Sequence, residues 1–314
     1  MSKAKILVCD GMDADIFEKL CAHPQLQVYP KAKNSQEEIA KLCPDMHGLI
    51  IRSATTCDAD FLARCPQLRY IIRAGEGTDN IDKDYCRQKN IAVSNTPGAN
   101  NNSAAEHAIA LMFTLLRHTA QANAEMQQGI WNKSAHSGLE LTGKTLGIVG
   151  MGRIGQLVAQ RLSGFQLKTY YYDPFLAQSD LAQKTETLEE LLELSDIVTL
   201  HLPKSPETEN LFTLQQFEKM KKSSYLINAA RGKIVNEADL LNALQQGLIA
   251  GAALDVFAQE PLAKDSPLVA AHPNLILTPH LGASTSEAAY RVGEKTLEQI
   301  VAFFVEDKLI NSVL

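Results

Sequence analysis

The stretch "GIVGMGRIGQLVAQRL", residues 147–162, limits the possible fold more than any other part of the sequence. Its three glycines, Gly150, Gly152 and Gly155, form a G-x-G-x-x-G pattern where an apolar run ends and a helical pattern begins. A second apolar run ends in Asp173, 18 residues after the third glycine. These features predict a strand–turn–helix–strand unit that binds the pyrophosphate of a dinucleotide. A glycine turn without a function is the plainer alternative.

Asp173 also carries a prediction about the cofactor. In a dinucleotide fold, an acidic residue at this distance from the glycines accepts hydrogen bonds from the adenosine ribose hydroxyls. A 2′-phosphate on that ribose would meet the charge of the carboxylate. We therefore expect NAD and not NADP, with the pyrophosphate at the N-terminus of the helix that follows Gly152.

Apolar runs alternate with amphipathic stretches along the chain, which is typical of parallel sheets with helices on both faces. In the first hundred residues the pattern predicts strands at 4–10, 48–53, 68–74 and 91–96, and helices at 13–22, 35–43 and 58–65. From residue 144 it predicts strands at 144–150, 168–173, 196–202, 224–230, 251–257 and 274–280, and helices at 153–163, 187–194 and 236–246. The fold class is therefore α/β, with two doubly wound parallel-sheet domains.

The two series of elements predict a discontinuous arrangement of domains. A Rossmann-type cofactor domain, residues 100–284, would be inserted into a flavodoxin-like substrate domain made of residues 1–99 and 285–314. The last predicted helix, 284–306, is long enough to reach back to the first domain.

A stretch with helical periodicity, residues 101–129, separates the two series. Ser103 and Glu106 have the S-x-x-E spacing of a capping box, so we expect them at the N-terminus of this helix. Apolar residues surround most of the helix, which predicts burial between domains or subunits. Glu106 and His107 are accordingly expected to be a cap and a packed residue, and not catalysts.

Composition and charge argue against several classes of protein. Hydrophobic residues make up 45% of the chain and charged residues 21%, and the net charge of −6 comes without a basic stripe, so no nucleic-acid partner is expected. No apolar run approaches the ~20 residues of a membrane helix, and no signal peptide is evident. Six cysteines lie in the first third without a C-x-x-C pair. We expect reduced, mostly buried thiols, a cytoplasmic location and no bound metal, with a zinc site as the weaker alternative.

Three polar residues near the ends of predicted strands are candidates for acid–base chemistry. Reduction of a carbonyl by hydride needs a cation that holds the substrate, a proton donor and a group that orients the donor. Arg231 could grip a carboxylate with two parallel hydrogen bonds. Glu260, 20 residues before His280, could hydrogen-bond one ring nitrogen and fix the tautomer of that histidine. The plainer alternatives are a surface arginine, a solvated glutamate, and a packed or metal-bound histidine.

The segments around these residues resemble the D-isomer-specific 2-hydroxyacid dehydrogenase family. The stretches that carry the resemblance are "GKTLGIVGMGRIGQ", "LHLPKSPETENL", "LINAARGKIVNEADLLNAL", "GAALDVFAQEPL" and "LTPHLGAST". They are similar to the family's cofactor and catalytic signatures in order and spacing, and the resemblance covers nearly the whole chain. It implies hydride transfer between a nicotinamide cofactor and C2 of a small anionic 2-hydroxy or 2-oxo acid.

The resemblance also implies roles for the matching residues. Arg231 would bind the carboxylate and keto oxygen of the substrate, His280 would act as acid and base, and Glu260 would be its partner. Asp255 would hold the nicotinamide carboxamide, and His201 would line the cofactor site without acid–base work. The expected cofactor-binding residues are Gly150, Gly152, Arg153, Ile154, Gly155, Asp173, His201, Pro203, Thr208, Ala229 and Asp255.

In the first domain, the stretch "RAGEGTDNID" resembles a glycine-rich loop of the family that cradles the substrate carboxylate with backbone amides. The matching positions are Ala74, Gly75 and Gly77. Glu76 stands where the family usually carries a small uncharged residue, and we expect its side chain to point outward, away from an anionic substrate. A plain turn is the alternative interpretation of this loop.

Other stretches, such as "NTPGANNNSAAEHAIALM", resemble the phosphoglycerate-oxidising members of the family, which begin serine synthesis. That resemblance places Arg52 and Arg73 near a substrate phosphate and Asn100 beside the substrate. Two solvated surface arginines are the alternative. The chain ends at Leu314, so we expect a short form without the regulatory domain of longer members. The segment after Trp131 lacks the dense basic cluster of those members, which weakens the argument for a phosphate.

Other functions therefore stay open. A glyoxylate or hydroxypyruvate reductase, or another D-2-hydroxyacid dehydrogenase, is the main alternative, and an NAD-sensing, corepressor-like binding protein is a remote one. The family usually forms dimers through the cofactor domain. We accordingly expect a homodimer, and the apolar helix at 103–116 fits such a contact.

Overall fold

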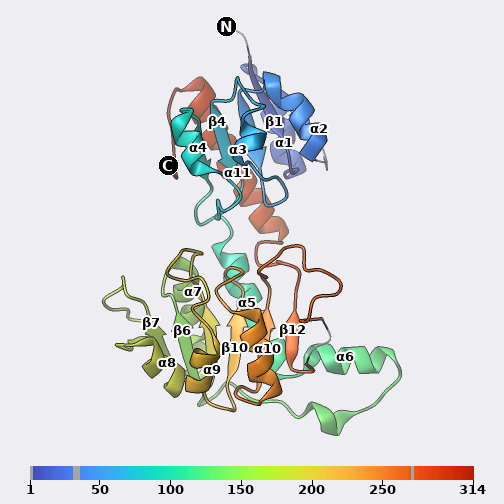
Figure 1. The fold of residues 1–314 in the computed structure, drawn as a ribbon, viewed down its shortest axis with the longest axis vertical. Helices are drawn as coiled ribbons and strands as arrows, with labels where there is room; N and C mark the ends of the chain where they lie inside the picture. Colours follow the sequence, from blue (N-terminus) through green and yellow to red (C-terminus); the bar gives the residue numbers. More distant parts are fainter. Residues whose placement is uncertain (1–2, 31–35, 270–271) are drawn as a thin grey trace. The chain divides into compact units, whose positions relative to one another are not determined.

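The structure is a computed structural model that describes residues 3–30, 36–269 and 272–314. The chain divides into two compact units, each with its own parallel sheet (Figure 1). Unit 1 comprises Met1–Asn100 and Ser284–Leu314, and unit 2 comprises Asn101–Ala283. These boundaries differ by one residue from those that the sequence predicts.

Unit 1 is built on a five-stranded sheet in the order β2-β1-β3-β4-β5, the strand order of flavodoxin-like folds. All its strand pairs are parallel. The strands are β1 (Ala4–Val8), β2 (Leu26–Pro30), β3 (Gly48–Ile51), β4 (Tyr70–Arg73) and β5 (Ala92–Asn95). The helices are α1 (Ala14–Ala22), α2 (Gln36–Leu42), α3 (Ala59–Leu62), α4 (Lys83–Gln88) and α11 (Ser286–Val305). The predicted helix at 35–43 thus begins at a residue outside the described part of the chain.

Both faces of this sheet are covered, which explains why its central strands are continuous apolar runs. On one face, Tyr70 of β4 stacks on Phe303 of α11 with 4.3 Å between the ring centroids. The other face packs against α2, α3 and α4 and contains five buried cysteines, Cys9, Cys43, Cys57, Cys65 and Cys86. All six cysteines are free, and Cys21 is exposed. Burial raises the pKa of Cys86 to about 11.

Unit 2 is built on a seven-stranded parallel sheet in the order β12-β11-β10-β9-β6-β7-β8. Its strands are β6 (Thr145–Val149), β7 (Lys168–Tyr172), β8 (Gln183–Lys184), β9 (Ile197–Leu200), β10 (Tyr225–Asn228), β11 (Gly251–Leu254) and β12 (Leu275–Leu277). The chain order reverses between β6 and β9, as in a Rossmann-type fold. Its helices are α5 (Asn101–Leu116), α6 (Thr119–Gln127), α7 (Arg153–Leu162), α8 (Leu188–Leu194), α9 (Leu214–Lys219) and α10 (Glu237–Gln245). The α/β fold with two doubly wound parallel sheets is therefore confirmed.

The predicted helix at 101–129 is wrong in two respects. It is broken into α5 and α6 at His118, whose φ of +53° is left-handed and cannot continue a helix. Helix α5 begins at Asn101, so Ser103 lies inside its first turn and cannot be the N-cap of a capping box. Glu106 forms an ion pair with Arg161 of α7 at 3.6 Å. The apolar side of α5 packs into the core of unit 2 itself.

No helix in the described part of the chain combines the length and apolar character that crossing a membrane requires.

Candidate functional site

Of the three predicted glycines, Gly150 and Gly152 form the turn between β6 and α7, and Gly155 lies in the first turn of α7. Gly150 has a φ of +91°, and its N–H donates to Tyr172 O of β7 at 2.9 Å. A Cβ on Gly155 would lie 2.3 Å from Gly150 O. A side chain there would push the helix away from the turn, because the atom that it would meet first belongs to the backbone. The glycines therefore let α7 begin directly against the end of β6.

The N-terminus of α7 has the features that a bound diphosphate needs. Gly152 is its N-cap, and no side chain caps the helix there. A Cβ on Gly152 would meet no atom within 4 Å, so the space above this residue is open. Arg153 and Ile154 form the first positions of the helix, where backbone amides and the helix dipole favour an anion. The turn thus fits the pyrophosphate of a dinucleotide.

Asp173 follows β7 and shapes this turn. Its Oδ2 accepts the N–H of Met151, between the first two glycines, at 2.9 Å. Its Oδ1 accepts the N–H groups of Phe175 and Leu176 at 2.8 and 3.2 Å. Two carboxylate oxygens can together accept about four hydrogen bonds, so capacity for a ribose hydroxyl remains.

The segment after β9 carries the next predicted residues. His201 donates its backbone N–H to Val149 O at 2.8 Å, and its Nε2 lies 3.0 Å from Thr199 Oγ1. Burial lowers the pKa of His201 to about 4, so the ring is neutral at pH 7. Thr208 closes the following loop, because its hydroxyl donates to Pro203 O at 2.8 Å.

His280 and Glu260 form the closest pair of titratable candidates. His280 Nδ1 lies 2.7 Å from Glu260 Oε2, and the two side chains are 41% and 35% exposed. Glu260 Oε1 accepts the N–H of Phe257 at 3.0 Å. Burial raises the pKa of Glu260, but the hydrogen bonds from His280 and Phe257 outweigh it and hold this pKa below its usual value. An ionised Glu260 accepts a hydrogen bond from the Nδ1–H of His280, so Nε2 is the ring nitrogen that can take part in proton transfer.

The backbone of His280 is held by Asp255, which follows β11. His280 has a φ of +54°, and its N–H donates to Asp255 O at 2.8 Å. The carboxylate of Asp255 is fully buried and accepts the N–H groups of Leu281 and Gly282 at 2.8 and 2.9 Å. Thr278 Oγ1 donates to it at 2.6 Å.

His107 of α5 completes this network. Its Nε2 lies 3.1 Å from Asp255 Oδ1 and 3.2 Å from Thr278 Oγ1. Burial alone would raise the pKa of Asp255, but hydrogen bonds from His107, Thr278 and the Leu281 amide hold it below its usual value. Asp255 is therefore an ionised group at the centre of the turn that carries His280. The sequence gives no local signal for the link between His107 and Thr278, which lie 171 positions apart, and this link was not predicted.

Arg231 follows β10 on a turn fixed by Asn228. Asn228 Nδ2 donates to Arg231 O at 3.0 Å, and Asn228 Oδ1 accepts the N–H of Ala230 at 3.1 Å. Arg231 Nη1 donates to Ala230 O at 2.7 Å, and Ala229 is half-buried just before it. The next residue, Gly232, packs so closely that a Cβ would lie 1.8 Å from Phe257 O. The loops that carry Arg231 and Glu260 are therefore in direct contact.

In unit 1, the predicted glycine-rich loop follows β4. Arg73 ends that strand, and its guanidinium folds over Gly75, where a Cβ would lie 1.6 Å from Nη1. Ala74 and Gly75 are buried, and Gly77 is half-buried. Glu76 does not point into solvent as predicted: it is half-buried, and its Oε2 accepts the N–H of Gly98 at 2.7 Å. That hydrogen bond ties the loop to the segment that follows β5.

Arg52 and Asn100 occupy similar positions after β3 and β5. The N–H of Arg52 donates to the carboxylate of Asp10, and Arg52 O accepts Asn80 Nδ2 at 2.7 Å. Asn100 Oδ1 is buried and has no hydrogen-bond partner among the described residues. An orphaned buried acceptor of this kind is expected where a ligand supplies the donor.

All the predicted residues thus lie at or beyond the carboxyl ends of parallel strands, the edge at which ligands bind in such sheets. In unit 2, Arg231, Glu260 and His280 follow β10, β11 and β12, and the glycine turn follows β6 at the same edge of the sheet. In unit 1, Arg52 follows β3, and the Arg73–Gly77 loop begins at the end of the neighbouring β4. Within the described residues, no group of three or more His, Cys, Asp or Glu side chains could hold a metal ion.

Comparison with known proteins places the chain among dehydrogenases. Residues 109–282 match the family model described as "D-isomer specific 2-hydroxyacid dehydrogenase, NAD binding domain". The chain is 43% identical over 313 residues to D-3-phosphoglycerate dehydrogenase of Rattus norvegicus. That match covers 99% of this chain and 58% of the rat protein, so the chain spans little more than half the length of this relative.

Solved structures of similar proteins differ in cofactor and substrate. An NAD-dependent formate dehydrogenase from Staphylococcus aureus, in complex with NAD, superposes with a TM-score of 0.88 at 32% identity, over 99% of both chains. A second structure is an NADPH-dependent glyoxylate/hydroxypyruvate reductase from Sinorhizobium meliloti in complex with NADP and malonate. It superposes with a TM-score of 0.87 at 27% identity, over 99% of this chain and 97% of the reductase. On the family match and the shared fold, this chain belongs to the D-isomer specific 2-hydroxyacid dehydrogenase family.

Proposed function

We propose that the protein is an NAD-dependent dehydrogenase that interconverts a D-2-hydroxy acid and the corresponding 2-oxo acid. The observation that carries the proposal is the 2.7 Å pair of His280 and Glu260, in the same unit as a glycine turn that fits a dinucleotide. A bound nicotinamide would supply or accept the hydride. The residues of this chain supply proton transfer, charge and orientation.

The roles follow from the contacts in unit 2. Glu260 holds Nδ1 of His280, so Nε2 donates a proton to the oxygen at C2 during reduction and removes it during oxidation. The guanidinium of Arg231 binds the oxygen at C2 and the carboxylate. Asp255 fixes the backbone of residues 280–282 and so positions His280. The neutral ring of His201 lines the cofactor site.

Replacing His280 with Ala should lower kcat by the ~10²–10⁴-fold that a lost general acid typically costs. Glu260→Gln keeps a hydrogen-bond acceptor but removes the counter-charge of the protonated imidazole. This variant should shift the pH profile of reduction toward lower pH. Steady-state NADH oxidation between pH 5 and 9 measures both effects. His136→Ala, at the end of the 3-10 helix Lys133–His136 of unit 2, is the control. Near-normal turnover in the His280 variant would rule out its proposed role.

We propose NAD as the cofactor because Asp173 presents a carboxylate beside the glycine turn, where a 2′-phosphate would be repelled. Asp173→Ala should raise the ratio of kcat/KM with NADPH to kcat/KM with NADH by at least tenfold. It should also weaken NADH binding, because Met151 loses its acceptor. Asp180→Ala, on an exposed loop after β7, controls for the general loss of negative charge. An unchanged cofactor ratio in the Asp173 variant would contradict this assignment.

For the substrate, we propose 3-phosphoglycerate and its oxidation product, 3-phosphohydroxypyruvate. The support is the 43% identity to a D-3-phosphoglycerate dehydrogenase and the placement of Arg52 and Arg73 near the predicted carboxylate loop. Two guanidinium groups would neutralise the phosphate as a second anionic group. A glyoxylate or hydroxypyruvate reductase is the second candidate, supported by the structural similarity to such an enzyme.

A substrate panel distinguishes the two candidates. NADH oxidation with phosphohydroxypyruvate should exceed that with hydroxypyruvate and glyoxylate. Arg52→Ala should lower kcat/KM for phosphohydroxypyruvate by about 10- to 100-fold, the effect of a hydrogen bond to a charged group worth ~1.5–3 kcal/mol. The kcat/KM for hydroxypyruvate should stay unchanged in the Arg52 variant. Arg87→Ala, an exposed arginine paired with Asp84, is the matched control. Equal rates with both hydroxypyruvates would favour the reductase.

We also propose a homodimer that forms through unit 2. Helix α5 is buried in the core of its own unit, so it is not the contact that the sequence predicts. Three exposed apolar side chains are close together in sequence on α6 and the loop after it: Met126 is 51%, Ile130 46% and Trp131 81% exposed. Figure 1 shows this segment at the margin of the unit 2 sheet. A second copy would cover these side chains.

Sedimentation velocity tests the dimer. The wild type should sediment at twice the chain mass of 34.4 kDa, and Trp131→Ala should shift it toward the monomer. Phe175→Ala removes an even more exposed aromatic ring, 97% exposed, outside this segment and should leave the dimer intact. A monomeric wild type at micromolar concentration would refute the proposal.

A further inference from the structure

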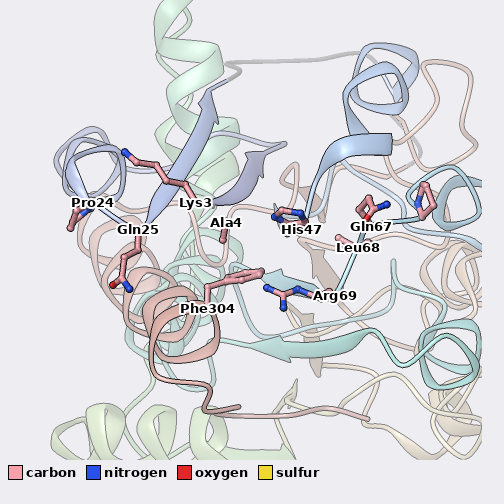
Figure 2. A pocket seen from close by; sticks show the side chains of 10 residues that line it. Lys3, Ala4, Pro24, Gln25, His47, Gln67, Leu68, Arg69 and Phe304 are labelled. Carbon is pink, nitrogen blue, oxygen red and sulfur yellow. The ribbon is translucent and has the colours of Figure 1, made fainter. Parts of the chain in front are cut away.

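A pocket of about 740 Å³ lies at the amino-terminal edge of the unit 1 sheet (Figure 2). Its walls come from the starts of four neighbouring strands and from the end of α11. The lining residues are Pro24 and Gln25 before β2, Lys3 and Ala4 at β1, His47 before β3, Pro66, Gln67, Leu68 and Arg69 before β4, and Phe304 of α11. The predicted substrate residues follow the carboxyl ends of β3, β4 and β5. The pocket is therefore at the opposite edge of the same parallel sheet.

The charge around this pocket is positive. Lys3 and Arg69 contribute cations, and the described residues that line it include no carboxylate. The nearby carboxylate of Asp45 forms an ion pair with Lys5 at 3.9 Å, which offsets its charge. An anion that enters the pocket would meet no lining group that repels it.

The guanidinium of Arg69 packs against an aromatic ring. Its guanidinium carbon lies 5.2 Å from the centre of the Phe304 ring, and Figure 2 shows the two side chains next to each other. Its backbone N–H donates to His47 O at 2.9 Å, which joins the starts of β3 and β4. Within the described residues, the guanidinium has neither an ion pair nor a hydrogen bond. The N–H groups of the guanidinium can therefore donate two parallel hydrogen bonds to an oxyanion.

His47 offers a second donor with a fixed orientation. Its Nδ1 accepts the N–H of Lys5 at 3.0 Å, and its own backbone N–H donates to Lys5 O at 2.9 Å. Burial, Arg69 and Lys5 lower the pKa of His47, against the opposing effect of Asp45, so the ring is neutral at pH 7. A neutral ring that accepts at Nδ1 carries its proton on Nε2. His47 therefore has one N–H left to donate.

We propose that this pocket binds a small organic anion through a phosphate or carboxylate group, with Arg69 and His47 as donors to its oxygens. The volume is within the ~300–1,000 Å³ typical of small-molecule sites, far more than a bare phosphate needs. Lys3 and Gln25 lie at the other end of the pocket and can contact the rest of the ligand (Figure 2). The site shares no residue with the proposed dehydrogenase site.

Titration of the full chain with inorganic phosphate and, separately, with malonate tests the proposal. The His47 ring signals in NMR spectra, identified by their loss in His47→Gln, are the local readout. At least one of the two anions should shift these signals in a saturable way. The anion with the lower Kd shows whether the pocket prefers a phosphate or a carboxylate group. Because no turnover is measured, failure of the dehydrogenase proposal would not affect the result.

Variants of Arg69 decide whether the binding is specific. Arg69→Gln should raise the Kd of the anion at least tenfold. Arg69→Lys keeps the positive charge but loses the paired N–H groups of the guanidinium, so it should raise the Kd less. Arg64→Gln, an exposed arginine outside the pocket, should leave binding unchanged. The proposal is overturned if neither anion shifts the His47 signals, or if the Arg64 variant weakens binding as much as the Arg69 variant. If Arg69→Gln does not fold, wild-type affinity in Arg69→Lys would still contradict bidentate binding.

Discussion

The buried carboxylate of Asp255 is the constraint on which the arrangement of unit 2 depends. A charge without exposure to water must be fully hydrogen-bonded, because an unpaired buried ion costs several kcal/mol. Asp255 meets this condition through two backbone amides, a threonine hydroxyl and an imidazole. Thr278, Leu281 and Gly282 among these partners follow β12, so the carboxylate and the left-handed turn at His280 stabilise each other. The imidazole is thereby placed against Glu260 without being buried.

Much of the fold could be predicted from the sequence, because strands buried on both faces are continuous apolar runs. The elements that were missed lack that signal. Strands β2 and β8 lie at sheet edges, and their sequences "LQVYP" and "QK" mix polar with apolar residues. The break between α5 and α6 occurs at "RHTA", which contains neither glycine nor proline. Only the left-handed backbone of His118 reveals it.

The individual residues of the candidate site could be predicted, because glycine spacing and polar residues after strands are local features of the sequence. The interactions between those positions could not. The sequence indicates that Glu260 can reach His280, but it contains nothing that joins His107 on α5 to Asp255. The same holds for Glu76, whose exposure was predicted from the repulsion between its carboxylate and an anionic substrate. Its partner, the amide of Gly98, belongs to a segment 22 residues away.

The five buried cysteines of unit 1 have a practical consequence. Every cysteine of the chain precedes residue 87, so unit 2 contains none. Burial raises the pKa of the Cys9, Cys57 and Cys86 thiols, and a protonated thiol in a packed core reacts slowly with alkylating reagents. Reaction at these positions requires local opening of the face that packs against α2, α3 and α4. Exposed Cys21 reacts without such opening, so it is the labelling rate of the five buried thiols that reports the opening of unit 1 alone. In other measurements of unfolding, both units would contribute to the same signal.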